Sequence, residues 1–242
     1  MGQDILQISV EGAIATLVMN RPEKRNAMCE ELLHALESFF SAPPGGVKVA
    51  ILTGTAGHYC SGLDLSEHVH REPEENFYHS RHWHSVMEKI QFGGLAVVSA
   101  MFGAVIGGGM ELAAATHVRI AEPSTIFQLP EGRRGIFVGG GATARVGRII
   151  GPDRMTEMML TGRKYSADEG LTLGLAHYSV GEGEAMSLAQ TVAGKISRNA
   201  QFANMLMLQA IPRINDMGRD DGLFAEALAA SMSQTTPDAQ EG

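Results

Sequence analysis

Residues 92–110 read FGGLAVVSAMFGAVIGGGM, a run of 19 residues without a charged side chain, and Glu111 follows directly. The length of the run and its Gly103-x-x-x-Gly107 spacing are compatible with a membrane helix. Six of these residues are glycine, however, and each glycine inside a helix costs about 0.5–1 kcal/mol relative to alanine. We therefore expect a buried strand, a turn and the start of a buried helix, and no membrane span.

Strand and helix patterns alternate on both sides of this run. Residues 5–10 and 13–19 flank Glu11-Gly12 and predict a hairpin. Beyond residue 184 only helical patterns occur, so residues 1–184 are expected to form an α/β body and residues 185–242 a helical C-terminal subdomain. The other predicted elements are helices at 30–40, 138–150, 153–160, 185–197, 200–210 and 216–233, a helix that starts at 108, and strands at 47–53, 95–100, 117–121 and 126–128.

Composition narrows the possible functions. The 242 residues include 19 Lys+Arg and 27 Asp+Glu, for a formal net charge of −8. Broad nucleic-acid binding needs basic surface, so we expect no nucleic-acid partner. The two cysteines, Cys29 and Cys60, cannot build a disulfide framework or a cysteine-rich zinc site, which favours a cytoplasmic protein.

Two carboxylates stand out against their surroundings. Glu111 lies between the uncharged run and Leu112, so burial is expected to raise its pKa and suit it to acid–base chemistry. The glycines at 107–109 leave N–H donors free at a helix start, where an anion could bind. Glu131 follows 20 residues later, after Pro130. Alone, each feature also fits a capped helix, a tight turn or an exposed turn; together they indicate an active site.

Other motifs point to rival chemistries. Residues 139–144, GGGATA, match a dinucleotide-binding pattern, but only residues 136–138 could supply the preceding strand. His79 and His82 could share a helix face, yet no acidic residue lies at zinc-ligand spacing, so we expect no metal and interpret residues 66–84 as a polar stretch that lines or covers a pocket. Cys60 could be a nucleophile, although a small buried residue is the more usual role.

Several motifs occur in an order that resembles the crotonase superfamily of enoyl-CoA hydratases and isomerases. They are NRPEKRNA at 20–27, YCSGLDL at 59–65, IGGGMEL at 106–112, LPE at 129–131 with GGGAT at 139–143, and LTG, SA and GL at 160–162, 166–167 and 174–175. The resemblance implies a spiral of ββα units with a helical C-terminal trimerisation subdomain. It also implies a homotrimer or a dimer of trimers that acts on an acyl-CoA thioester, with coenzyme A as part of the substrate and no other cofactor.

The resemblance assigns site residues by position. Glu111 would activate the water that attacks Cβ, and Glu131 would protonate Cα. The backbone N–H groups of Ser61 and Gly108 would form the oxyanion hole. The residues expected to bind coenzyme A are Lys24, Arg25, Ala27, Cys60, Ser61, Asp64 and Leu65, and those expected to line the acyl pocket are Leu63, Gly107, Gly132 and Ile136.

The first choice of function is hydration of a 2-enoyl-CoA, since both glutamates are present. The alternatives are a Δ3,Δ2-enoyl-CoA isomerase, a hydratase-lyase acting on an aromatic acyl-CoA, and an acyl-CoA-binding protein without turnover. Three features depart from the family pattern: residues 137–143 lack its proline, Ser66 stands where a basic residue is common, and the chain ends where a basic segment would begin. Lys24, Arg25 and backbone groups would therefore carry more of the contact with coenzyme A.

Overall fold

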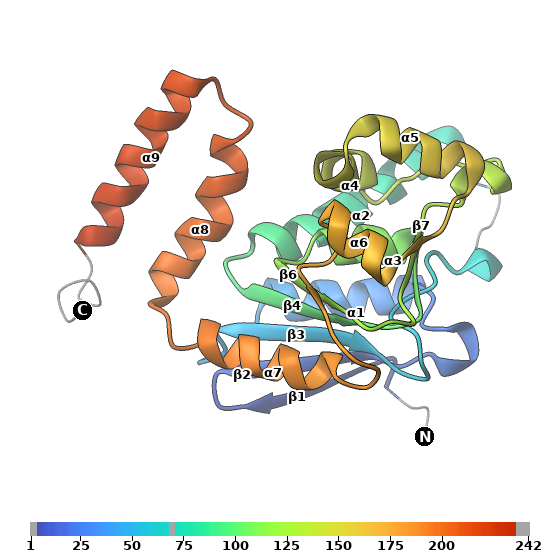
Figure 1. Ribbon diagram of the computed structural model, residues 1–242, viewed down its shortest axis with the longest axis horizontal. Helices are drawn as coiled ribbons and strands as arrows, with labels where there is room; N and C mark the ends of the chain where they lie inside the picture. The colour runs from blue at the N-terminus through green and yellow to red at the C-terminus, as the bar shows by residue number, and fades with distance from the viewer. Residues whose placement is uncertain (1–3, 68–70, 236–242) are drawn as a thin grey trace.

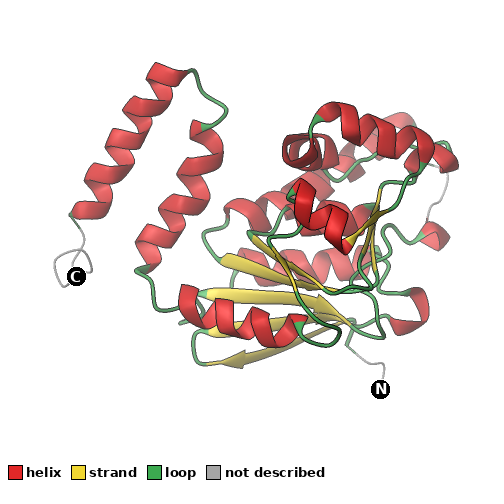
Figure 2. Ribbon diagram, in the orientation of Figure 1, coloured by secondary structure: helices red, strands yellow, loops and turns green. Residues whose placement is uncertain are grey.

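Residues 4–67 and 71–235, the part of the chain that the computed structural model describes, form a six-stranded main sheet and a three-stranded second sheet (Figures 1 and 2). The main sheet has the order β1-β2-β3-β4-β6-β9, with β1 antiparallel to β2 and the other neighbours parallel; the second has the order β5-β7-β8. The strands are β1 (Leu6–Glu11), β2 (Ile14–Met19), β3 (Val49–Gly54), β4 (Ala96–Met101), β5 (Ala104–Ile106), β6 (Val118–Ala121), β7 (Ile126–Gln128), β8 (Tyr165–Ser166) and β9 (Tyr178–Ser179).

Helices cover both faces of the main sheet, and the α/β prediction is confirmed. Pairs of strands followed by a helix recur along the chain, as in β1-β2-α1 and β4-β5-α3. The α-helices are α1 (Glu30–Ser41), α2 (Pro73–Phe92), α3 (Gly108–Ala114), α4 (Ala142–Ile150), α5 (Pro152–Thr161), α6 (Ala167–Leu173), α7 (Ala185–Ile196), α8 (Gln201–Ile214) and α9 (Arg219–Gln234), and the short 3-10 helices are η1 (Pro22–Lys24), η2 (Leu65–Glu67) and η3 (Glu131–Arg134).

The uncharged run forms the predicted buried strand and helix start, together with a second strand, β5, that was not predicted. It supplies the end of α2, then β4, β5 and the first turn of α3, and all residues of β4 are buried. No helix among the described residues is long and apolar enough to cross a membrane. The run therefore brings the glycines at 107–109 and Glu111 into the interior of the fold.

Alternation along β3 divides the interior into two cores. Ala50 and Leu52 belong to the larger core, which includes the apolar faces of α1 and α2. Val49 and Ile51 point to the opposite face and pack in a smaller core with residues of α7. Because both faces are covered, β3 is buried along its whole length, as is expected of a parallel strand between helical layers.

Two expectations about helices need correction. No helix was predicted within residues 66–84, but α2 begins at Pro73 and continues to Phe92; His68 and His70 lie outside the described residues. Proline at the first position and a capping box between Glu72 and Glu75 start this helix. The helix predicted at 138–150 begins only at Ala142, and residues 136–138 form no strand, so the context that a dinucleotide motif requires is missing there.

The C-terminal helices differ in how they pack. α7 lies on the main sheet, where Ala185, Ala189 and Ala193 are fully buried against β3, β4 and β6. By contrast, α8 and α9 pair with each other and extend away from the sheets (Figure 1). Several large apolar side chains on this pair are exposed, namely Met207, Ile211, Leu223, Phe224, Leu228 and Met232. The division of the chain after residue 184 stays a prediction.

Candidate active site

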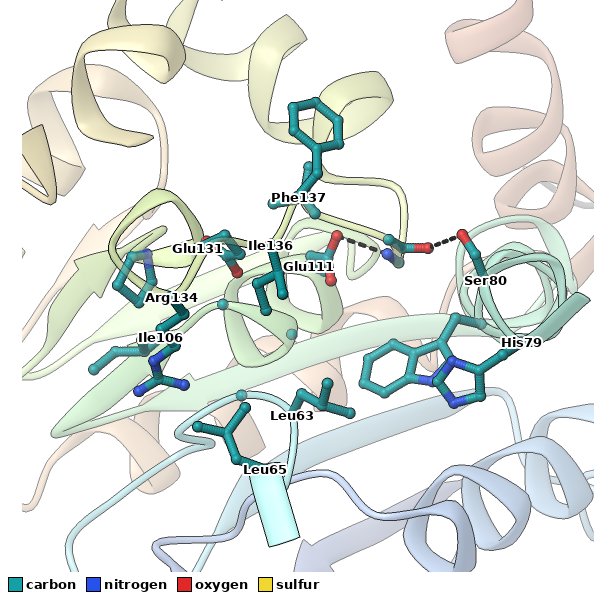
Figure 3. A pocket seen from close by; sticks show the side chains of 18 of the residues that line it. Leu63, Leu65, His79, Ser80, Ile106, Glu111, Glu131, Arg134, Ile136 and Phe137 are labelled. Carbon is teal, nitrogen blue, oxygen red and sulfur yellow. Dashed lines mark hydrogen bonds between the residues drawn. The ribbon is translucent and has the colours of Figure 1, made fainter. Parts of the chain in front are cut away.

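A cavity of about 450 Å³ opens where α2, the 61–65 loop, the start of α3 and residues 130–140 meet (Figure 3). Glu111 and Glu131 both line it. Its apolar lining comes from Leu63, Leu65, Ile106, Ile136, Phe137 and Val138, and its polar lining from Ser61, Arg71, Asn76, His79, Ser80 and Arg134. The two carboxylates that stand out in the sequence thus share one mostly apolar cavity, which is the usual setting of an active site.

Glu111 is held by backbone N–H groups. Its side chain is 4% exposed, and its Oε1 accepts hydrogen bonds from the N–H of Gly140 at 2.8 Å and of Ala142 at 3.1 Å. Burial raises the pKa of Glu111, and the Ala142 and Gly140 N–H groups oppose that rise. A Cβ on Gly140 would lie 2.6 Å from Oε2, so only glycine allows the loop to approach this carboxylate so closely. A carboxylate fixed in this way suits the role of a base.

Glu131 is buried without a comparable partner. It begins η3 and is 7% exposed, and its Oε2 has no hydrogen-bond partner among the described residues. Burial raises its pKa to about 7, with a further rise from the charge of Glu111. Gly107 has a φ of +54°, and a Cβ there would lie 2.9 Å from Oε1 of Glu131. A carboxyl group that holds its proton near neutral pH is suited to act as an acid.

The neighbouring arginines, Arg133 and Arg134, do not bring the pKa of Glu131 down to the usual value of a glutamate. The charge of Arg134 lowers the pKa of Glu131, but burial outweighs it. Arg133 points elsewhere, because its guanidinium donates to the carbonyl of Thr161 at 2.6 Å. Arg134 makes no ion pair with Glu131 within the described part of the chain.

The expected pair of oxyanion-binding N–H groups needs one correction. The backbone N–H of Ser61 donates to the carbonyl of Arg25 at 3.1 Å, so it is not free for a ligand. The N–H groups of Leu63 and Gly108 have no acceptor among the described residues. They are also close together, since a Cβ on Gly108 would lie 3.5 Å from the nitrogen of Leu63. Leu63 thus replaces Ser61 beside Gly108 as the candidate donor.

The two loops assigned to coenzyme A are joined to each other. Arg21 forms an ion pair with Asp64 at 2.7 Å, the Nζ of Lys24 lies 3.7 Å from the same carboxylate, and the hydroxyl of Ser61 donates to the carbonyl of Lys24 at 3.0 Å. The hydrogen bond from the Ser66 hydroxyl, with Arg21 beside it, keeps the pKa of Asp64 well below its usual range. Asp64 therefore holds the 59–65 loop against the 20–27 loop.

Of the remaining residues assigned to coenzyme A, two have buried side chains and two have exposed side chains. Ala27 and Cys60 are buried, so their side chains cannot touch a ligand at the surface. Burial also raises the pKa of the Cys60 thiol to about 12, which argues against a nucleophile. Leu65 is 45% exposed and lines the cavity, and Arg25 is exposed at the end of η1. Contact of Lys24, Arg25, Ser61, Asp64 and Leu65, and of the backbones of Ala27 and Cys60, with coenzyme A stays a prediction.

Three of the four residues expected in the acyl pocket, Leu63, Gly107 and Ile136, line the cavity. Their contact with an acyl group stays a prediction. Gly132, the fourth, is exposed and does not line this cavity, and a Cβ on it would meet the carbonyl of Met159 at 2.8 Å. Within η3, Glu131 is therefore buried in the cavity wall, whereas the next residue, Gly132, is exposed to solvent.

Part of α2 lies within residues 66–84, the stretch expected to line or cover a pocket, and it does line this cavity. His79, Ser80 and Trp83 line the cavity from one face of this helix. Trp83 is 5% exposed and packs against both Gly108 and Gly140, since a Cβ added to either glycine would lie within 3.0 Å of its ring. The spacing of Trp83, Val86, Met87 and Ile90 is helical, so extending that pattern backward would have found this face.

The histidines do meet acidic groups, although not at the spacing sought in the sequence. Glu30 and His34 of α1 and His82 of α2 place potential ligand atoms within 4.8 Å of one another. The Oε1 of Glu30 already lies 2.6 Å from Nε2 of His79 and 3.5 Å from the guanidinium of Arg71. The group therefore has the character of an ion-pair network between two helices, and the expectation of no metal stays a prediction.

A family model described as enoyl-CoA hydratase/isomerase matches residues 9–242. The chain belongs to this family. A short-chain-enoyl-CoA hydratase of Clostridium acetobutylicum is 30% identical over 96% of the chain and 90% of its own length. The human enoyl-CoA hydratase domain-containing protein 2, mitochondrial, is 31% identical over 95% of the chain and 81% of its own length.

Solved structures agree on the fold. An enoyl-CoA hydratase from Bacillus anthracis superposes with a TM-score of 0.92 at 29% identity and covers 98% of this chain and 94% of its own. A Rhodopseudomonas palustris protein named as a candidate enoyl-CoA hydratase reaches a TM-score of 0.96 at 42% identity, with 98% and 92% covered. The crotonase fold expected from the motifs is therefore confirmed.

Proposed function

We propose that this member of the family hydrates 2-enoyl-CoA thioesters. The observation that carries the proposal is the pair of buried carboxyl groups, Glu111 and Glu131, in one cavity with different environments. Glu111 is oriented by two backbone N–H groups, and Glu131 holds a proton near neutral pH. Hydration needs one group that accepts a proton from water and one that donates a proton to carbon.

In the proposed reaction, Glu111 takes a proton from a water molecule while the water oxygen bonds to Cβ of the substrate. The π electrons of the double bond move toward the thioester carbonyl, whose oxygen gains negative charge. The N–H groups of Leu63 and Gly108 stabilise this oxygen, a contribution worth about 10² to 10³ in rate for one such donor. Glu131 then gives its proton to Cα, and the two carboxyl groups regain their starting states by proton exchange.

The substrate would enter along the joined loops of residues 20–27 and 59–65. Lys24, Arg25, Ser61 and Leu65 would contact coenzyme A, and the apolar side chains at 63, 106 and 136–138 would surround the acyl group. No other cofactor is needed for this chemistry. The exposed apolar side chains of α8 and α9 support a trimer or a dimer of trimers, in which a second copy would cover them.

The test is loss of the conjugated enoyl absorbance with a panel of short, long and aromatic enoyl-CoA substrates. Wild type is compared with Glu111→Gln and Glu131→Gln. We expect both variants to lose about 10² to 10⁴ in rate. Activity that survives Glu111→Gln would favour single-carboxylate isomerisation, and binding of acyl-CoA without any turnover would favour a non-catalytic protein.

A further inference from the structure

Ser80 is connected to Glu111 through a single peptide unit. The hydroxyl of Ser80 donates to the carbonyl of Gly139 at 2.6 Å, and the N–H of Gly140 donates to Oε1 of Glu111 at 2.8 Å (Figure 3). This carbonyl and this N–H are the two ends of the planar group that joins Gly139 to Gly140. A side chain on α2 therefore fixes one end of the peptide whose other end holds the carboxylate.

The direction of the Ser80 side chain is informative. Serine inside a helix commonly bonds to the carbonyl of its own preceding turn, and it is a weaker helix former than alanine. Here the hydroxyl instead leaves its helix and reaches a separate loop. The loop also rests on the next turn of α2, because a Cβ on Gly140 would lie 2.9 Å from Trp83.

The loop has few other anchors. Residues 136–141 form no helix or strand, and the structure gives no hydrogen bond for the backbone of Phe137 or Val138. The ring of His84, one turn beyond Ser80, also interacts with the backbone of Gly139. Arg145 of α4 also donates to the carbonyl of Gly140, at 3.4 Å, so the hydroxyl of Ser80 makes the shorter of these two side-chain hydrogen bonds to the loop and the one to the peptide that orients Glu111.

We propose that Ser80 is a positioning residue that fixes Glu111 through the Gly139–Gly140 peptide. Hydrogen bonds at the two ends of one peptide polarise each other, so loss of the hydroxyl both frees the loop and weakens the N–H donor to Glu111. This inference rests on the proposed role of Glu111 as the base in hydration.

The kinetic test compares Ser80→Ala with Ser80→Thr, which keeps a hydroxyl, and with Ser85→Ala, an exposed serine of α2 whose side chain has no hydrogen bond in the described structure. We expect Ser80→Ala to lower kcat by about fivefold to tenfold, the effect of one hydrogen bond, with little change in KM. Ser80→Thr should restore most of the rate, and Ser85→Ala should match wild type. Equal rates for Ser80→Ala and wild type would overturn the proposal.

A double-mutant cycle distinguishes positioning from a general loss of structure. If Ser80 acts through Glu111, Ser80→Ala should have no further effect on the residual rate of Glu111→Gln. Independent, multiplying effects of the two substitutions would contradict the proposal. Circular dichroism of each variant checks that the fold is retained.

A titration of Glu111 gives a readout that does not need turnover. The charged groups that face Glu111 are Arg145 on α4 and Glu131, and neither is altered by Ser80→Ala. A weaker N–H donor stabilises the carboxylate less, so the pKa of Glu111 should rise in Ser80→Ala and not in Ser80→Thr or Ser85→Ala. Carbon-13 NMR of labelled glutamate, with the signal assigned by Glu111→Gln, measures it.

An unchanged titration in Ser80→Ala would overturn the positioning role even if the protein hydrates enoyl-CoA. A shifted titration without any hydration would instead support the contact and contradict the proposed function. The two failures are therefore distinguishable.

Discussion

Gly140→Ala tests whether the loop must approach Glu111 as closely as the structure shows. The added Cβ would lie 2.6 Å from Oε2 of Glu111 and 2.9 Å from Cε3 of Trp83. Both neighbours are buried, with exposed fractions of 4% and 5%, so neither has open space to move into. The backbone of Gly140 is not in the left-handed region, so alanine is compatible with its conformation and the effect comes from the contact itself.

Relief of this contact requires a shift of about 1 Å between the loop and the carboxylate, since nine in ten real Cβ contacts are longer than 3.4 Å. A misplacement of that size in an active site reduces rate by about 100-fold. The same crowding should lower the free energy of unfolding by about 1–3 kcal/mol. We therefore expect a large loss of kcat in a protein that remains folded.

Gly139→Ala is the matched control, because its added Cβ would make only ordinary contacts with Ser80, at 3.5 Å from Oγ and 3.9 Å from Cβ. Initial rates of enoyl-CoA hydration are measured for wild type and both variants, and thermal unfolding confirms that each is folded. The account predicts about a 100-fold loss for Gly140→Ala and a loss of no more than about threefold for Gly139→Ala. Equal activities of the two variants would refute the reasoning.

Three further predictions concern other parts of the molecule. Because burial raises the pKa of Glu131 to about 7, its proton-donating form is lost above that pH, and kcat/KM of wild type should fall by about tenfold per pH unit there; a profile flat to pH 9 would exclude this group as the acid. Asp64→Asn removes the ion-pair partner of Arg21 and should lower the free energy of unfolding by about 3 kcal/mol at pH 7. Since the folded-state pKa of Asp64 is depressed, its contribution is present above the unfolded value of about 3.9 and is lost as the pH falls, so urea denaturation should show a smaller difference at pH 3. Phe224, which is 69% exposed on α9, should be covered by a second copy, so Phe224→Glu should reduce the mass measured by light scattering, and an unchanged mass would exclude this face from the assembly.

The sequence was sufficient where one physical signal dominated. The six glycines of the uncharged run favoured burial over a membrane helix, and the glycines at 107–109 with Glu111 marked the cavity because charge at the edge of an apolar core is rare. The hairpin around Glu11-Gly12 and the helical C-terminal region followed from short-range patterns. These features depend on local residues alone.

The sequence was insufficient where the outcome depended on contacts between distant segments. Which N–H group of the 61–63 segment stays free was decided by Arg25, whose carbonyl accepts from Ser61 and leaves Leu63 available. The polar surface of α2 hid its helical start at Pro73, and the role of Ser80 depends on a loop 59 residues away. Neither relation leaves a periodic signal in the chain.

The reaction in deuterium oxide enriched in oxygen-18 tests the central claim most directly, with the product analysed by mass spectrometry. Hydration by Glu111 and Glu131 predicts a 3-hydroxyacyl-CoA with the heavy oxygen at Cβ and deuterium at Cα. Both labels should disappear together in Glu111→Gln and in Glu131→Gln. Deuterium incorporation without heavy oxygen in wild type would show proton shuttling by isomerisation and would contradict the account.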